Sequence, residues 1–247
     1  MSTDAQSFDE RLRKAFSFNT IEEYEQYKSR LSELGVFIRA LQDEWYCAKA
    51  FLGTDWSDID DAIDSLDLDM GDLSINDFDS HERDQHLRRT LVRTLFAMIE
   101  GTTFAYKQHI LADYEASRGQ LSHAEYAVLT EEAYQLTNSG TIRTSPNYPN
   151  IKANIKFAFP LYARTLGADF KFTPSLDKDP GWQSLCQSIE IRNRLMHPKS
   201  LEELEVSDAD LKHAYRAADW FEDQVNRLEN ISWEAIKRLL AEVQEKG

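Results

Sequence analysis

The stretch HERDQHLRRTLVRTLFAMIEGTTFAYKQHILADYEAS, residues 81–117, decides the fold class. Its middle is apolar on nearly every side of a helix, through Leu91, Val92, Leu95, Phe96, Met98, Ile99, Phe104, Tyr106, Ile110 and Leu111. A helix with apolar side chains all round is buried among other helices. The stretch therefore predicts a long helix inside an all-α bundle.

One polar line crosses this apolar helix. Arg93, Glu100 and Lys107 are spaced seven residues apart, so they share a helix face. Two interpretations stay open. The line is an internal ion-pair ladder or solvent-facing stripe, or Glu100 and Lys107 line or brace a site between helices.

The neighbouring segments are also helical in pattern. Residues 21–52 place apolar side chains at steps of three and four, and a shorter helix is expected around 4–16. Ser122 and Glu125 form a capping-box pattern for a helix at 121–137, and a turn-rich break follows at 137–150. A helix near 150–166 contains Pro160, which should kink it. No stretch has a convincing strand pattern.

The last part of the chain predicts two further helices. Ser207 and Asp210 cap the first of them, and a separate final helix carries Trp233, Ile236, Leu239, Leu240 and Val243. Together the segments favour an N-terminal part, residues 1–80, packed on a helical bundle of residues 81–247.

The acidity of the chain is local. The formal net charge is −15, but residues 55–84 alone hold 11 Asp and one Glu against a single Arg. The rest of the chain has an ordinary balance. We interpret this segment as a solvated acidic loop, with an electrostatic lid over a basic groove as the alternative; it fits the calcium-loop pattern poorly.

The sequence lacks the patterns of secreted, membrane-spanning, disulfide-rich and metal-binding proteins. The N-terminus has no signal-peptide pattern, no apolar run is long enough for a membrane span, and Cys47 and Cys186 lie far apart. The histidines lack metal-ligand spacing. We expect a cytoplasmic protein with no metal and no cofactor.

The helix before Pro198 carries the most informative residues. Asp179 and Pro180 predict its start, and Pro198 its end. The inward line of Trp182, Leu185 and Ile189 continues at Arg192. A guanidinium that points into the interior between helices is costly to bury unless it meets a partner, a cleft or a subunit interface.

Arg192, Asn193 and His197 together suit phosphodiester chemistry. The guanidinium stabilises charge on a phosphate, and the imidazole moves a proton to or from a ribose oxygen. Asn193 can orient the phosphate or the imidazole. The 2′-hydroxyl of RNA supplies the nucleophile, so this chemistry needs no metal. Arg194, Lys199 and Lys107 could supply a local basic surface, and with Glu100 they are the candidate substrate-binding residues.

The string Arg192-Asn193-x-x-x-His197 resembles the R-x4–6-H motif of HEPN domains, over about residues 81–245. The resemblance implies an α-helical bundle that forms a homodimer, with the three residues as the catalytic set. It also implies a metal-independent endoribonuclease acting on RNA, as in toxin–antitoxin and phage-defence systems, with an antitoxin or defence partner protein.

Two alternatives remain open at this point. Some HEPN-like domains are non-catalytic binding or scaffold modules. In an unrelated helical interaction protein, Arg192 would pair with Glu190, Glu100 or another acid, and His197 would only cap its helix.

Overall fold

The computed structural model describes residues 13, 18, 20–52, 80–116 and 120–245. Apart from residue 13, the helix expected around 4–16 lies outside these residues, and so does most of the acidic segment 55–84.

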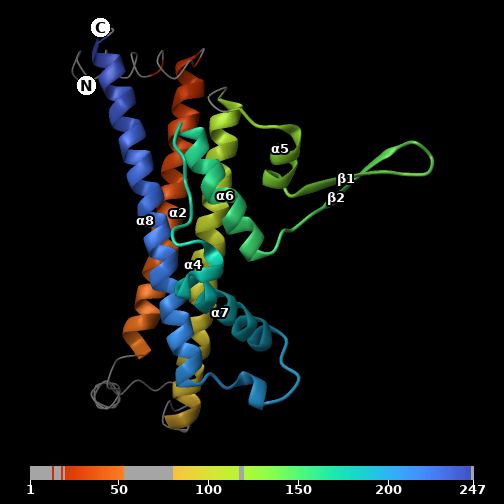
Figure 1. Ribbon diagram of the computed structural model, residues 1–247, viewed down its shortest axis with the longest axis vertical. Helices are drawn as coiled ribbons and strands as arrows, with labels where there is room; N and C mark the ends of the chain where they lie inside the picture. The colour runs from red at the N-terminus through yellow and green to blue at the C-terminus, as the bar shows by residue number, and fades with distance from the viewer. Residues whose placement is uncertain (1–12, 14–17, 19, 53–79, 117–119, 246–247) are drawn as a thin grey trace, which may run out of the picture. The chain divides into compact units, whose positions relative to one another are not determined.

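The described chain is all-α apart from one small hairpin, as the sequence predicts (Figure 1). The predicted helices at 21–52 and 81–117 are α2 (Ile21–Leu52) and α4 (Ser80–Glu115). The Pro160-containing helix is α6 (Ile151–Thr165), and the helix before Pro198 is α7 (Pro180–Met196). Two short 3-10 turns, η2 (Leu176–Lys178) and η3 (Glu202–Leu204), precede and follow α7.

The chain contains a hairpin where the sequence predicted a longer helix and a turn. Helix α5 (His123–Leu129) is short, and β1 (Glu132–Leu136) pairs with β2 (Ile142–Pro146) in antiparallel register, Glu132 opposite Pro146. Gly140, at φ 74°, forms the turn between them. Strand β2 is exposed throughout and β1 has no buried residue. The alternation of apolar and polar residues by which a half-buried strand is normally predicted is therefore missing.

The two predicted C-terminal helices are one continuous helix, α8 (Asp208–Glu245). The predicted capping box is present at its start, because the Asp210 amide donates to Ser207 Oγ over 3.2 Å and the Ser207 amide donates to the Asp210 carboxylate over 2.9 Å. The sequence between 229 and 235 has no Gly or Pro to interrupt the helix. The predicted break was therefore wrong.

The contacts divide the chain into two compact units, which we describe separately. Unit 1 comprises residues 1–39, 100–173 and 222–247, and unit 2 comprises residues 40–99 and 174–221. Helices α2, α4 and α8 each contribute residues to both. The expected division at residue 80 stays a prediction.

The core of unit 1 surrounds Tyr106 of α4. Its ring centroid lies 5.5 Å from that of Phe159 and 4.7 Å from that of Tyr162, both on α6. Helix α2 joins this core through a 2.6 Å hydrogen bond from the Tyr27 hydroxyl to the Asp113 carboxylate. The apolar side chains named for 91–111 are buried as predicted, except for Phe104, which is 45% exposed.

The core of unit 2 fixes the start of α7 against α8. Asp179 is buried and accepts hydrogen bonds from the amides of Gly181 (2.8 Å) and Trp182 (3.3 Å). Its other oxygen accepts from Trp220 Nε1 over 2.9 Å. A Cβ on Gly181 would lie only 2.5 Å from Trp220 Cβ, so this crossing requires glycine.

We predict that Gly181→Ala lowers the free energy of unfolding by about 1–3 kcal/mol, because the methyl group overpacks the contact with Trp220. Urea denaturation measures the change. The matched control is Gly35→Ala in α2, where the new Cβ meets only Arg39 Nη1 at 3.8 Å. Helix propensity should make that variant more stable by up to ~1 kcal/mol. Equal effects in the two variants would contradict the packing at Gly181.

A second prediction concerns the capping box of α5. The hydrogen bond from Arg164, followed by that from the Ser122 amide, lowers the pKa of Glu125 from 4.5 to about 2. A carboxyl whose folded pKa is lowered stabilises the fold above its unfolded pKa, and this contribution is lost as the pH falls through the folded value.

Glu125→Gln should therefore reduce the free energy of unfolding by about 1 kcal/mol near neutral pH. The difference from the wild type should shrink below pH ~4.5 and vanish below pH ~2. Urea denaturation across this range measures it, with Glu44→Gln, an exposed site on α2, as the control. A difference that stays constant with pH would contradict the role of the carboxylate.

Candidate functional site

The predicted motif lies at the C-terminal end of α7 in unit 2. Trp182, Leu185 and Ile189 are buried, as their spacing predicts, and Arg192, next on that line, is half-buried. Met196, the next residue on this helix face, is 49% exposed, so the row of buried side chains ends at Arg192. Arg192 thus lies at the edge of the core.

Arg192 packs on an aromatic side chain of α4. Its guanidinium carbon lies 5.9 Å from the centroid of the Phe96 ring, and Nη1 donates to Asn193 Oδ1 over 3.5 Å. The ring restricts the orientation of the guanidinium. Asn193 itself is exposed.

His197 is the residue at which α7 ends. Its backbone has left the helical region, at φ −135° and ψ 55°, although its amide still donates to the carbonyl of Asn193 over 3.1 Å. The side chain is exposed. The predicted end of the helix before Pro198 is therefore confirmed.

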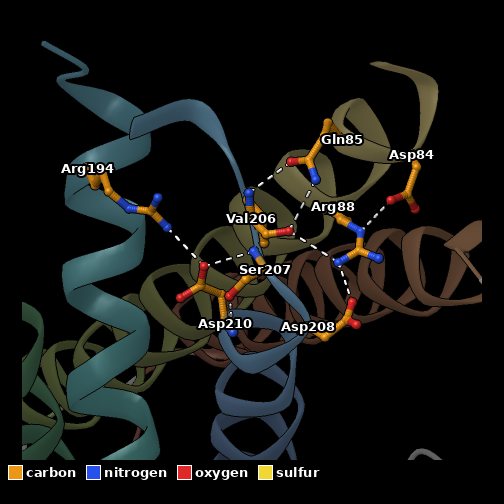
Figure 2. A network of polar contacts seen from close by, with 8 residues as sticks. All are labelled: Asp84, Gln85, Arg88, Arg194, Val206, Ser207, Asp208 and Asp210. Carbon is orange, nitrogen blue, oxygen red and sulfur yellow. Dashed lines mark hydrogen bonds and ion pairs between the residues drawn. The ribbon is translucent and has the colours of Figure 1, made fainter. Parts of the chain in front are cut away.

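The segment that follows His197 is held by a polar network (Figure 2). Gln85 of α4 is buried and bonds twice to Val206: Oε1 accepts from its amide over 2.8 Å, and Nε2 donates to its carbonyl over 3.3 Å. Arg88 donates to the same carbonyl over 3.2 Å and to the carboxylates of Asp84 and Asp208, each at 2.6 Å.

Arg194 belongs to this network as well. Its guanidinium donates to the carbonyl of Glu205 over 2.7 Å and to the Asp210 carboxylate over 3.1 Å. Arg194 and Arg88 therefore hold the entry into α8 (Figure 2). The structure gives Arg194 a positioning role, and its contact with substrate stays a prediction.

Lys199 is exposed, and its backbone amide donates to the Glu203 carboxylate over 2.6 Å. Glu202, Glu203 and Glu205 follow within a few residues, so acidic groups accompany the basic ones in this segment. RNA binding requires a basic surface, and the acidic groups of this segment limit its extent.

Glu100 and Lys107 lie in unit 1. Glu100 is exposed, whereas Lys107 is fully buried and its ammonium donates to Glu131 Oε1 over 2.7 Å. The partner of Lys107 thus comes from outside the predicted polar line. The predicted role of both residues in binding RNA stays a prediction.

Several residues of the site were not predicted. Gln85, Arg88 and Phe96 come from α4, more than 95 positions before the motif. Arg88 and Asp84 have the i, i+4 spacing of a helical ion pair, which was a usable signal. Nothing in the sequence indicated the pairing of Gln85 with Val206.

The described residues contain no group of three or more His, Cys, Asp or Glu side chains that could hold a metal ion. Within the same residues, no helix is both long enough and apolar enough to cross a bilayer.

We predict that Gln85→Ala reduces the free energy of unfolding by about 1–3 kcal/mol, because Val206 is buried and loses the partner of its amide. Hydrogen exchange should show faster exchange of the Val206 amide. Gln183→Ala, which removes only an exposed bond to the Asp177 carbonyl, should change stability by less than ~0.5 kcal/mol. Unchanged protection of Val206 would contradict the network.

Comparisons of the chain with protein-family models, with curated proteins and with solved structures gave no significant match in any of the three.

Proposed function

We propose that this protein is a metal-independent endoribonuclease of the HEPN type, with Arg192, Asn193 and His197 as its catalytic residues. The observation that carries the proposal is the placement of the three side chains at the end of α7. Arg192 is restrained on Phe96, Asn193 lies beside it, and His197 is exposed where the helix stops.

The chemistry follows from these groups. The 2′-oxygen of a ribose attacks the adjacent phosphorus, and the bond to the 5′-oxygen of the next nucleotide breaks. One proton leaves the 2′-hydroxyl and one joins the departing 5′-oxygen, and His197 moves one of them. Arg192 stabilises the charge that develops on the phosphate oxygens. The products are a 2′,3′-cyclic phosphate and a 5′-hydroxyl.

The neighbouring arginines support this assignment. Arg88 and Arg194 donate to acids and backbone carbonyls of the segment 205–210, which makes them structural. Arg192 contacts the Phe96 ring and donates to Asn193 Oδ1, and a guanidinium is suited to bind an anionic ligand such as a phosphate.

A homodimer is part of the proposal. Two exposed apolar side chains lie within and shortly after the motif, Met196 (49% exposed) and Leu201 (84% exposed). Apolar side chains beside a polar site suit contact with a second copy of the chain. We infer that two motifs then share one RNA-binding cleft.

The proposal predicts cleavage of RNA in the presence of EDTA. Wild-type protein should cut tRNA or total RNA, and Arg192→Ala and His197→Ala should each lower the rate at least ~100-fold. Asn193→Ala should cause a smaller loss, because it removes an orienting group. The rate of substrate loss on denaturing gels measures each effect.

The controls are Arg216→Ala and His86→Ala, exposed residues of the same types in unit 2, which should retain wild-type rates. Light scattering on the same preparations should give the mass of a dimer. Binding of RNA without cleavage by the wild type would favour the non-catalytic module, and cleavage that persists in both motif variants would overturn the assignment.

A further inference from the structure

Unit 1 contains a cavity of about 310 Å³ that the proposed ribonuclease chemistry does not use. It is lined by α4 between Glu100 and Lys107, by the first turns of α6, and by the residues on either side of the hairpin, Glu131 and Tyr148. This volume is at the lower end of the range of ~300–1,000 Å³ for small-molecule sites.

The wall of the cavity contains a buried charge. The Lys107 side chain is 2% exposed, and its ammonium lies 2.7 Å from the Glu131 carboxylate, which is 29% exposed. Burying an ammonium is costly unless a carboxylate and hydrogen bonds compensate for lost water. The pair therefore places a fixed, partly accessible carboxylate at the cavity.

Glu131 has an unusual backbone. Its φ is 58°, in the left-handed region, at the position after the C-cap of α5 where glycine is the ordinary residue. That conformation costs a non-glycine residue ~1–2 kcal/mol. Asn147 holds it by donating its amide to the Glu131 carbonyl over 2.7 Å. Strain of this kind concentrates at binding and catalytic sites.

Asn154, on α6, contributes an unused hydrogen-bond acceptor. Its Nδ2 donates to the Pro149 carbonyl over 3.1 Å, and because a carbonyl only accepts, this bond fixes which way the amide is turned. Asn154 Oδ1 is buried and has no hydrogen-bond partner among the described residues. A buried acceptor of this kind is stabilised by a donor from a ligand.

The charge of the lining selects the ligand. Glu100 and Glu131 against Lys107 leave one net negative charge, and a phosphate would meet two carboxylates. Two exposed rings also line the cavity, Phe104 (45%) and Tyr148 (75%). Carboxylates, an orphan acceptor and aromatic faces together suit a positively charged group with several N–H donors.

We propose that this cavity binds an organic cation through a guanidinium or primary ammonium group, with Glu100, Glu131 and Asn154 as acceptors. The group can belong to a free small molecule or to an Arg or Lys side chain of a protein partner. The Lys107–Glu131 pair holds the acceptor in place. This inference is independent of the proposed cleavage of RNA.

Isothermal titration calorimetry of the full chain with agmatine, putrescine and a capped arginine amide tests the proposal, at constant ionic strength. Butanol serves as the neutral probe. We expect agmatine or the capped arginine to bind with a Kd of about 1 mM or tighter, which lies in the range of weak specific binding. Butanol should give no saturable heat.

Glu100→Gln should weaken this binding at least ~10-fold, because it removes the negative charge and keeps the shape. Glu44→Gln, at an exposed acid of α2, should bind as the wild type does. Agmatine binding alone would assign a free small molecule, and binding of the capped arginine as well would assign a protein side chain.

The proposal is overturned if the cationic probes give no more heat than butanol, or if Glu100→Gln binds them as tightly as the wild type. Because Glu100 is exposed, the variant should keep the thermal midpoint of the wild type, and a preserved midpoint shows that lost binding is not lost folding.

Discussion

The buried carboxylate of Asp179 is the constraint on which unit 2 depends. It accepts three N–H groups, two from the first turn of α7 and one from the indole of Trp220 on α8. A carboxylate in a poorly solvated place is stable only when such donors satisfy it. Because Gly181 lets the two helices touch, the start of α7 is fixed both in its position against α8 and in its rotation about its own axis.

That rotation determines where the motif lies. A helix turns by a fixed angle per residue, so fixing Trp182 also fixes the direction of Arg192 and Asn193. The far end of α7 is held separately, by Arg194 and by the contacts of Gln85 and Arg88 with Val206. The motif thus lies between two anchored points, which is the pre-organisation that phosphodiester chemistry needs.

Much of this could be predicted from local patterns. Helices α2, α4, α6 and α7 follow from apolar spacing and capping residues, because those signals act within a few residues. The half-buried position of Arg192 follows from the line of Trp182, Leu185 and Ile189. The hairpin could not be predicted in this way, because its strands bury almost nothing and so leave no alternating pattern. Contacts across long separations, such as Gln85 with Val206 or Lys107 with Glu131, have no local signal at all.

In the proposed reaction the ribose 2′-hydroxyl attacks the phosphate, so the chemical ends of the RNA products distinguish it from cleavage by attack of water. Mass spectrometry of an RNA oligonucleotide cut in EDTA should find a 2′,3′-cyclic phosphate on one fragment and a 5′-hydroxyl on the other. The same oligonucleotide with a single 2′-deoxyribose at the scissile position should stay intact at that position. A 5′-phosphate on the product, or cleavage at the deoxyribose, would rule out the proposed attack by the 2′-hydroxyl.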